Sequence, residues 1–434
     1  MASSKKLRPK PKAPKRIAVA LSGGLDSVVL LDTVCRSQAK SKTPALEIYA
    51  FHIHHGLQKS ADDWLLFCEK LAQKYQIQFD FRLLHLADEK RGNIEGRARK
   101  ARYEALAELC EEYGIADLLL AHHQNDQAET VLLQLLRGSG VAGLSGMPNA
   151  RKLKSQNRQI TLWRPLLNQT RPELEAYAKQ HKLKWIEDPS NQDDVFKRNA
   201  IRKHIIPRLE KIQPEAISNL ARSASLLSES QVLLDRLAEI DGKDFLQGEI
   251  LDIRQLKTLA KRDQASANNV LRYWLKTRGL VMPSQERLSA WWQDLETVRV
   301  DSQLEWLHDD NTIRLWRGHL QVASSQEGQW VFKAIAIKSA KPGLSAAWVK
   351  RAKADGLIFT KARSGAEKLQ VKPNAPRRSL KNLFQESDVP PWQRHAPLLY
   401  VGDELIAVAG VGVSYPHLTC SGARVWPEWQ LLPS

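Results

Sequence analysis

The chain has 434 residues, which is long enough for about three domains with substantial cores. Lys and Arg number 65 against 48 Asp and Glu, and the net charge of +17 favours a polyanionic partner, most simply a nucleic acid. No stretch approaches the roughly 18 apolar residues of a membrane span. The cysteines lack any CxxC or paired spacing, which argues against zinc or iron–sulfur chemistry and for a reducing compartment; they are Cys35, Cys68, Cys110 and Cys420.

The chain starts with a strongly basic segment. Residues 1–16 carry seven basic side chains and no acidic one. The segment lacks the apolar stretch of a signal peptide, so we expect a disordered basic tail over residues 1–15 and a cytoplasmic protein. Its composition does not indicate what the tail does.

Residues 17–34 have the pattern of a strand, a loop and a helix. Residues 17–21 are apolar, residues 22–27 form the polar segment SGGLDS, and residues 28–34 are again apolar. Two glycines allow backbone N–H groups to turn inward at the start of a helix, and two serine hydroxyls add hydrogen-bond donors. The segment therefore predicts a phosphate-binding loop.

SGGLDS is not a P-loop, because no Lys-Ser or Lys-Thr follows the glycines, and it is not a GxGxxG loop. It resembles the SGGxDS signature of the PP-loop, or N-type, ATP pyrophosphatases, which hold the pyrophosphate of ATP and transfer AMP to an oxygen. A carboxylate among phosphates is unfavourable unless it caps an amide or holds a cation, so Asp26 either organises the loop or binds Mg²⁺. The resemblance implies that ATP binds at Ser22, Gly23, Gly24, Leu25, Asp26 and Ser27.

Further strands and helices follow in alternation. We expect strands within residues 46–57 and 77–84, and helices over residues 59–77 and 93–113, the second capped by Asn93. The first of these strands ends in three histidines, His52, His54 and His55. We interpret them as polar residues at the nucleotide end of the sheet rather than as metal ligands, because no carboxylate or cysteine has a matching spacing.

The sequence predicts a buried strand at residues 118–121 and a turn at residues 122–125. It then predicts a helix at residues 126–137, whose inward-facing side chains are Val131, Leu132, Leu135 and Leu136. Asn125 can cap this helix, and Asp126 and Glu129 would then lie in its first turn, where negative charge suits the helix dipole. Capping explains the two acids. It does not explain His122 and His123 at the end of a strand.

The alternation over residues 16–190 predicts an α/β domain with a doubly wound parallel sheet. The motifs SGGLDS, HIHHGL and HHQNDQAETVLLQLLRGSG, together with WRPLL (163–167) and EDPSNQDDVFKRNAIR (187–202), closely resemble the bacterial tRNA(Ile)-lysidine synthetase family, over nearly the whole chain. We expect a catalytic domain at 16–215, a connecting helix at 216–240, a mainly helical tRNA-binding domain at 241–325, a linker at 326–346 around a strand near 330–337, and a small, strand-rich α+β tRNA-binding domain at 347–434.

The resemblance implies a ligase that works in two steps. ATP would transfer AMP to the C2 oxygen of the wobble cytidine in a CAU-anticodon isoleucine tRNA, and the ε-amine of free L-lysine would then displace AMP to give lysidine. Mg²⁺ would neutralise phosphate charge, and Asp26 would either hold this ion or organise the loop. Arg99 and Arg102 fit the family pattern N-x-E-x-x-A-R-x-x-R-Y, although arginines on a helix are often only a solvated face. The implied catalytic residues are Asp26, Arg99, Arg102, His123, Asp126 and Arg198.

Lysine must lose a proton before it attacks, and a nearby carboxylate or histidine is required for this, but the sequence does not say which one. It also leaves open the lysine pocket, a homodimer and the contacts that reject the methionine tRNA with the same anticodon. Two alternatives remain: another PP-loop tRNA-modifying enzyme such as a 2-thiolase, which the missing cysteine pairs disfavour, and a non-catalytic RNA-binding protein.

The last domain carries a basic stretch at residues 363–381. We expect Arg377, Arg378 and Lys381 to contact the tRNA backbone. Family members often show Arg-x-Gly-Gly-Glu here, whereas this chain has Ala366 in place of the second glycine. Many of the tryptophans lie in the last two domains, where they either serve as apolar anchors or stack on bases.

Overall fold

The computed structural model describes residues 15–40, 46–54, 61–84, 94–154, 158–187, 197–298, 304–309, 311–323 and 328–431. Residues 1–14 of the predicted tail, His55, the predicted cap Asn93 and the whole DPSNQDDVF stretch (188–196) lie outside the described residues. The chain divides into two compact units, residues 1–234 and residues 235–434. Among the described residues, no helix has the length and apolarity needed to cross a bilayer.

The first unit is built on a six-stranded sheet in the order β3-β2-β1-β4-β6-β5. All neighbouring strands pair in parallel except the edge strand β5, which runs antiparallel to β6. The predicted parallel sheet is therefore confirmed, with one reversed strand added. The strands are β1 (Arg16–Ala20), β2 (Glu47–His54), β3 (Gln78–Leu83), β4 (Asp117–Leu119), β5 (Ala150–Lys154) and β6 (Gln159–Trp163).

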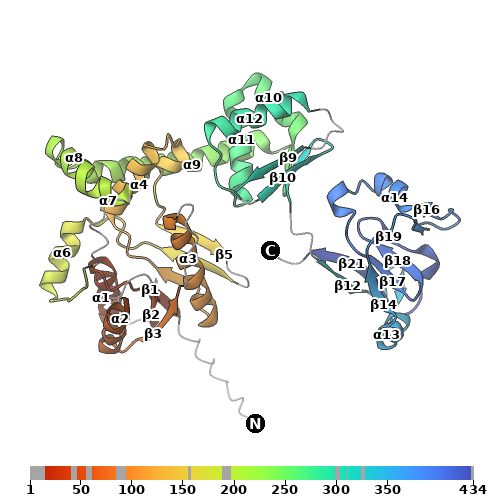
Figure 1. Ribbon diagram of the computed structural model, residues 1–434, viewed down its shortest axis with the longest axis horizontal. Helices are drawn as coiled ribbons and strands as arrows, with labels where there is room; N and C mark the ends of the chain where they lie inside the picture. The colour runs from red at the N-terminus through yellow and green to blue at the C-terminus, as the bar shows by residue number, and fades with distance from the viewer. Residues whose placement is uncertain are drawn as a thin grey trace, which may run out of the picture. The chain divides into compact units, whose positions relative to one another are not determined.

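Helices cover both faces of this sheet (Figure 1). On one face, apolar side chains of β1 and β2 form a core with α1 (Leu25–Lys40), α2 (Ala61–Tyr75) and α6 (Arg171–Gln180). On the other face the core is completed by α3 (Ile94–Glu112). This doubly wound arrangement places the ends of β1 and β4 side by side, because these two strands are direct neighbours. Ligands of such sheets bind at this edge.

Several helical segments after β4 lie outside the sheet. They include α4 (Gln124–Leu135) and α7 (Lys197–Ala200), which continues through a π-helical turn, Ile201–Ile205, into α8 (Ile206–Ile212). A π turn has one residue more per turn than an α-helix and often marks a functional site. The long helix α9 (Ala216–Gly242) occupies the region where we expected a connecting helix.

Residues 243–323 combine helices with a sheet that the sequence analysis did not predict. A five-stranded sheet in the order β7-β8-β11-β10-β9 shares one core with three helices, and the core holds Trp274, Trp291 and Trp306. The pattern was missed because the strands are only two to six residues long. The elements are β7 (Leu246–Gln247), β8 (Ile250–Asp252), α10 (Ile253–Arg262), α11 (Gln264–Thr277), α12 (Gln285–Thr297), β9 (Leu304–His308), β10 (Asn311–Trp316) and β11 (His319–Val322).

The last part of the chain is rich in strands, as predicted. The segment expected as a linker forms β12 (Gly328–Ile335) and β13 (Gly343–Ser345), which both pair with β21 (Arg424–Leu431) in the sheet β12-β21-β13-β20. A second sheet has the order β14-β17-β18-β19. The remaining elements are α13 (Ala346–Ala354), β14 (Ile358–Lys361), β15 (Lys368–Leu369), β16 (Arg378–Ser379), α14 (Leu380–Glu386), β17 (Leu398–Val401), β18 (Glu404–Val408), β19 (Gly412–Val413) and β20 (Leu418–Thr419).

Candidate active site

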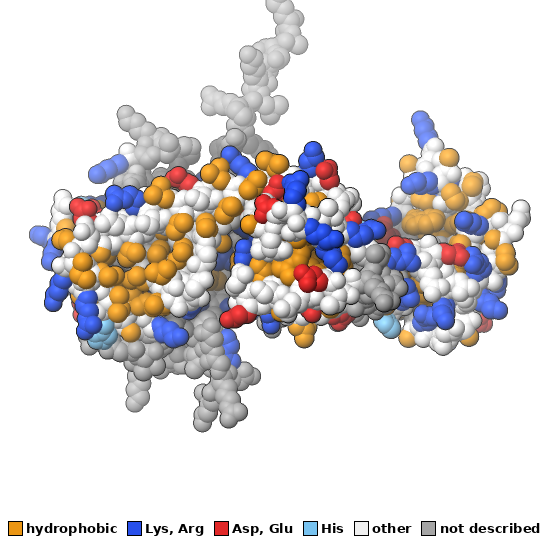
Figure 2. All heavy atoms as spheres, turned by 90° about the horizontal axis from the view of Figure 1, so that it is seen from above, with side chains coloured by type: hydrophobic (Ala, Val, Ile, Leu, Met, Phe, Trp, Pro, Cys, Tyr) orange, Lys and Arg blue, Asp and Glu red, His pale blue; other side chains and the backbone are white. Residues whose placement is uncertain are grey.

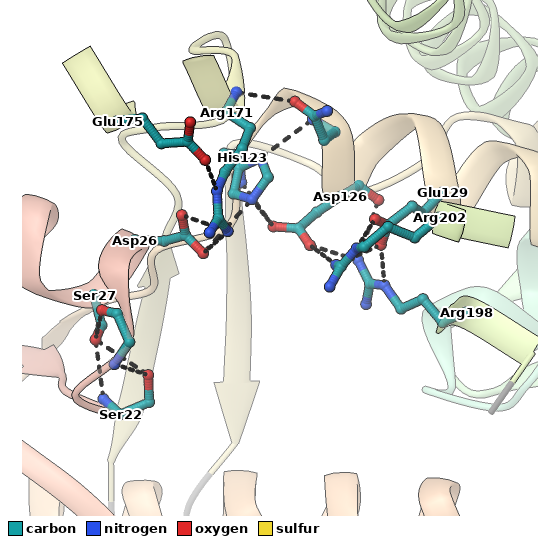
Figure 3. Close-up of polar contacts among 12 residues, drawn as sticks. Ser22, Asp26, Ser27, His123, Asp126, Glu129, Arg171, Glu175, Arg198 and Arg202 are labelled. Atoms are coloured by element: carbon teal, nitrogen blue, oxygen red, sulfur yellow. Dashed lines mark hydrogen bonds and ion pairs between the residues drawn. The ribbon is translucent and has the colours of Figure 1, made fainter. Parts of the chain in front are cut away.

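The SGGLDS loop joins β1 to α1 and is held by its two serines. The Ser22 N–H donates to Ser27 Oγ at 3.2 Å, and Ser27 Oγ donates to the carbonyl of Gly24 at 2.9 Å (Figure 3). Gly23 has a φ of +87°, and a Cβ there would lie 3.2 Å from the Cys68 sulfur. Both its backbone angle and its close packing therefore require glycine at this position.

A histidine of the neighbouring strand supports the start of the loop. His52 Nδ1 lies 2.8 Å from the carbonyl oxygen of Leu21, the residue before Ser22. Burial lowers the pKa of His52, so the ring is neutral at pH 7 and can donate one Nδ1–H to this carbonyl. His54 contacts Asp62 instead, with 3.2 Å between Nε2 and Oδ1. Both histidines thus lie toward the carboxyl end of β2, and their place at a nucleotide site stays a prediction.

A cavity of about 260 Å³ opens beside the loop. One wall consists of Ser22, Asp26 and Ser27, and the lining also includes Arg102 from α3 and His122 from the end of β4. Burial is the main reason why the pKa of Arg102 is lowered, with the charges of Arg99 and Arg198 adding to it. A guanidinium in such surroundings gains from an anionic ligand, since the ligand replaces lost hydration.

The two adjacent histidines have different environments. His122 lines the cavity, and burial lowers its pKa to about 3, helped by the nearby charges of Arg164 and Arg99. Its Nδ1 is buried and has no hydrogen-bond partner among the residues that the structure describes. At pH 7 the ring is therefore neutral and presents an unused polar atom beside the loop.

His123 rather than Asn125 caps α4, so the cap expected from the sequence is wrong. Its Nδ1 accepts the N–H of Asn125 at 3.3 Å, and its own N–H donates to Asp126 Oδ2 at 3.0 Å, which completes a capping box. The other ring nitrogen, Nε2, lies 3.6 Å from Asp26 Oδ2 and 3.5 Å from Asp126 Oδ2. One imidazole thus joins the loop carboxylate to the helix carboxylate.

Asp26 lies in the first turn of α1 and faces the cavity. Burial raises its pKa, although the charges of His123 and Arg171 act in the opposite direction. The Arg171 guanidinium, at the start of α6, lies 3.4 Å from both oxygens of Asp26. The carboxylate is therefore less stable in its charged form than an exposed aspartate, and it gains from a cation that enters the cavity.

Glu129 is completely buried and binds two arginines from the α7 segment. Arg198 Nε lies 2.5 Å from Oε2, and Arg202 Nε lies 2.6 Å from Oε1. The spacing of four residues places both guanidiniums on the same side of their helix. Arg198 also donates to Asp126 Oδ1 at 2.9 Å. Although burial raises the pKa of Asp126, the charges of His123 and Arg198 outweigh it, so the pKa is lowered. Our interpretation of Glu129 as a first-turn residue that only suits the helix dipole is wrong.

The contacts of His123 with Asp26 and Asp126, and of Arg198 with Asp126 and Glu129, form one continuous network, as Figure 3 shows. Of the predicted catalytic residues, the structure brings Asp26, His123, Asp126 and Arg198 into this network and places Arg102 on the cavity wall. Arg99 is exposed and donates to the Tyr103 hydroxyl at 3.3 Å. The sequence analysis missed four residues of the site: His122, Glu129, Arg171 and Arg202.

The three basic residues expected to bind tRNA lie around β16 and α14. Arg378 pairs with Glu386, whereas Arg377 and Lys381 are exposed. The preceding loop is organised by Glu367, whose carboxylate accepts the N–H groups of Ser364 and Gly365 at 2.5 and 2.8 Å. The described non-glycine residues with positive φ do not include Ala366, so its backbone conformation does not require the glycine that family members often have there.

The parallel sheet, the helices on both faces and the serine-glycine loop at the end of its central strand define a PP-loop protein. In agreement, the family model described as the PP-loop domain matches residues 2–209. The models described as the TilS substrate binding domain and the TilS substrate C-terminal domain match residues 255–321 and 358–429.

Similar proteins of known name narrow this class. A tRNA(Ile)-lysidine synthase of Burkholderia pseudomallei is 37% identical and aligns with 95% of this chain and 92% of its own length. Its counterparts in Nitrosomonas europaea and Proteus mirabilis are 36% and 35% identical, covering 94% and 95% of this chain and 90% and 95% of their own lengths. The chain belongs to the tRNA(Ile)-lysidine synthase family. Among solved structures, the U34-tRNA thiolase NcsA of Methanococcus maripaludis covers 50% of this chain and 72% of its own, with a TM-score of 0.43 and 20% identity, a likeness too distant to bear on function.

Proposed function

We propose that the protein joins L-lysine to C2 of the wobble cytidine of a CAU-anticodon isoleucine tRNA, consuming ATP and releasing AMP and pyrophosphate. The observation that supports this most directly is the cavity between the SGGLDS loop and Arg102, with the network of Asp26, His123 and Asp126 at its side. Such a site offers hydrogen-bond donors that can hold phosphates. It also offers carboxylates that can hold an ammonium group. The names of the relatives supply the choice of tRNA.

In the first step, the loop holds the pyrophosphate part of ATP. The hydroxyls of Ser22 and Ser27 and the N–H groups around Gly23 provide donors, and Arg102 offsets the charge that develops at the α-phosphate. Asp26 is the described carboxylate in the cavity lining, and Mg²⁺ is commonly held by one or two carboxylates plus substrate phosphates. Asp26 thus fits an ion that arrives with ATP, and such an ion would neutralise phosphate charge.

In the second step, the lysine amine loses a proton and displaces AMP. We assign the proton to Asp26 at the stage when it holds no ion, because this carboxyl faces the cavity and burial raises its pKa. His123 lies behind it and connects it to Asp126. His122, with a pKa lowered to about 3, is a poor base and is better suited to accept a hydrogen bond from a substrate.

The test combines the protein with ATP, labelled lysine and CAU-anticodon isoleucine tRNA. We expect label in the tRNA, one pyrophosphate per lysine, and lysidine among the nucleosides identified by mass spectrometry. Incorporation of sulfur instead of lysine would indicate a thiolase. Salt-sensitive tRNA binding without release of pyrophosphate by folded protein would indicate an RNA-binding protein without catalysis.

We further propose that the enzyme is cytoplasmic and that Arg377, Arg378 and Lys381 contact the tRNA backbone, since exposed cations on a loop and a hairpin position phosphates without reading sequence. In this proposal the first unit carries out the chemistry. The second unit holds the body of the tRNA and so excludes the methionine tRNA with the same anticodon. Filter binding with the two tRNAs would test it.

A homodimer is proposed on the basis of exposed apolar side chains. Figure 2 shows hydrophobic side chains gathered on the face of the first unit seen from above. Leu135 and Leu136 at the end of α4, expected to face inward, are 57% and 77% exposed, and Ile212 in α8 is 81% exposed. Single apolar residues on a surface are ordinary, whereas gathered apolar side chains such as those in Figure 2 are common at interfaces. Leu136→Lys together with Ile212→Lys should convert a dimer to a monomer in analytical ultracentrifugation.

A further inference from the structure

A second cavity lies within the last part of the chain, far larger than the one at the loop. It has a volume of about 930 Å³, in the range of ligand sites, and opens between the β12 and β21 strands and the segment 392–397. Four tryptophans line it: Trp330, Trp392, Trp426 and Trp429. The Trp330 indole N–H donates to the carbonyl of Pro397 at 2.9 Å and so holds the segment against the sheet.

These tryptophans are less buried than the core tryptophans of the preceding domain, although Trp330 and Trp426 also pack against a hydrophobic core. In residues 243–323, Trp274, Trp291 and Trp306 are buried and share one hydrophobic core. The four rings of the cavity are all half-buried, and each leaves part of its surface free. Tryptophans stabilise a core through the large apolar area that they bury. Four partly exposed indoles around one cavity instead favour a planar, aromatic guest.

The neighbourhood of the cavity is cationic. The Arg314 guanidinium lies over the Trp392 ring at 5.1 Å, and Arg394, next to two lining residues, lies 5.7 Å from the Trp316 ring. Trp316 and Trp392 meet edge to face, with 6.1 Å between their centroids. Burial lowers the pKa of Arg394, and the charges of Arg363 and Arg317 add to this. Among the described residues, the acids that pair with these four arginines are Glu305, on Arg314, and Asp388, on Arg317, and the pocket lining adds one further acid, Glu428. The excess positive charge excludes a cationic guest and favours an anion.

We propose that this cavity, which we call the tryptophan pocket, binds an unpaired nucleobase of the RNA substrate, with the adjoining phosphates at Arg314, Arg317 and Arg394. A nucleotide combines a flat π system with a phosphate, which matches aromatic walls beside a group of arginines. Gln393, His395 and Glu428 line the pocket as well and are exposed, so they can bond to the edge of a base. The inference rests on the proposed function in taking RNA, rather than a free nucleotide, as the source of the base.

The test measures binding of a fluorescent single-stranded RNA pentanucleotide to the full-length protein by anisotropy, without ATP or lysine. We expect Trp392→Ala to weaken binding about 5- to 100-fold, the range for loss of one base–aromatic stack, while Trp392→Phe retains most of the affinity. An abasic pentanucleotide of equal charge should bind the wild type as weakly as the intact one binds Trp392→Ala. Trp348→Ala is the matched control, because Trp348 is half-buried in the same region, stacks on His417 and does not line the pocket. It should bind like the wild type.

Equal binding of intact and abasic RNA would overturn the proposal, as would equal losses in Trp392→Ala and Trp348→Ala at matched unfolding midpoints. Competition by free AMP as effective as that by the pentanucleotide would also overturn it, because the pocket would then serve a small nucleotide. The proposal would also be overturned by an apolar peptide that displaces the RNA from the wild type but not from Trp392→Phe. Failure of the proposed function shows itself separately, as absence of lysidine from wild-type reactions with tRNA.

Discussion

In the first unit, arginines lie against carboxylates: Arg198 and Arg202 bind the buried Glu129, and Arg171 faces Asp26. In the second unit, Arg314 and Arg394 lie over the rings of Trp392 and Trp316. Matched charges hold catalytic groups in fixed positions and balance small charged reactants. Cations that lie on aromatic rings and outnumber their acidic partners attract a long polyanion. The contrast suggests that chemistry and RNA affinity reside in separate parts of the chain, and each prediction below tests that separation.

The largest effect is expected from Asp26→Asn. Loss of the carboxylate should lower ATP–pyrophosphate exchange by at least ~100-fold, whereas the affinity for tRNA should remain nearly unchanged. Since burial raises the pKa of Asp26, its charged form destabilises the fold, and that cost appears as the pH rises through the pKa. Asp26→Asn should therefore unfold at a higher temperature than the wild type at neutral pH and lose this advantage in acid.

Asp62→Asn serves as the control, because the Asp62 side chain is 86% exposed and lies outside the cavity lining. A fall in tRNA affinity as large as the fall in exchange would contradict the separation of the two regions.

Next in size is Glu129→Gln. The amide leaves two guanidiniums without their buried counter-charge, so we expect the free energy of unfolding to fall by about 3 kcal/mol in urea titrations. Pyrophosphate exchange should fall with it even under conditions where the variant is folded, since Arg198 also positions Asp126. Glu175→Gln removes an exposed partner of Arg171 and should cost less than about 1 kcal/mol. Equal costs for the two variants would show that Glu129 is not the centre of the network.

A smaller effect is expected on the salt dependence of tRNA binding. Arg377→Ser together with Lys381→Ser should weaken binding and reduce the slope of log K against log salt by about 0.7–0.9 for each lost phosphate contact. Lys350→Ser, an exposed lysine on α13, provides the matched loss of charge. An unchanged slope in the double variant, or the same change in Lys350→Ser, would remove this loop and hairpin from the interface.

The smallest effect concerns the loop at residues 364–367. Burial raises the pKa of Glu367, but the N–H groups of Ser364, of Glu367 itself and of Gly365 outweigh this and lower the pKa to about 2. Its stabilising contribution is therefore present above the unfolded value of 4.5 and lost as the pH falls toward 2. Glu367→Gln should speed amide hydrogen exchange in the loop at pH 6, and the difference from the wild type should shrink below pH 4.5. A constant difference across this window would contradict the assignment.

Local patterns predicted much of the first unit. Alternating strands and helices were evident from apolar periodicity, and SGGLDS marked the phosphate loop because its glycines and hydroxyls are adjacent in the sequence. Glu129 and Arg202 could not be paired in this way, because they are 73 residues apart and only the fold brings them together. The cap of α4 was misplaced because Asn is the more usual capping residue, whereas here a histidine ring has that role.

The second unit was harder to predict for a different reason. Its β strands around residues 246–322 are short and lack long apolar runs, so periodicity did not separate them from loops. The number of tryptophans was evident from the sequence, but their roles as core or pocket residues could not be predicted from it. Burial alone distinguishes the core residue Trp274 from the pocket residue Trp392, and burial depends on tertiary structure.

The π-helical turn at Ile201–Ile205 has a consequence for how this chain can vary in length. Such a turn accommodates one extra residue in an otherwise α-helical segment. Deleting one residue would allow regular α-helical hydrogen bonds, but each residue also sets the rotation of everything after it by about 100°. The α8 helix would then turn its buried Ile206 out of the protein, while Arg198, which precedes the turn, would stay in place. Insertions and deletions should therefore be far less tolerated between Arg202 and Ile206 than in the glycine-containing segment near Gly138 and Gly140, where a Cβ would meet open space.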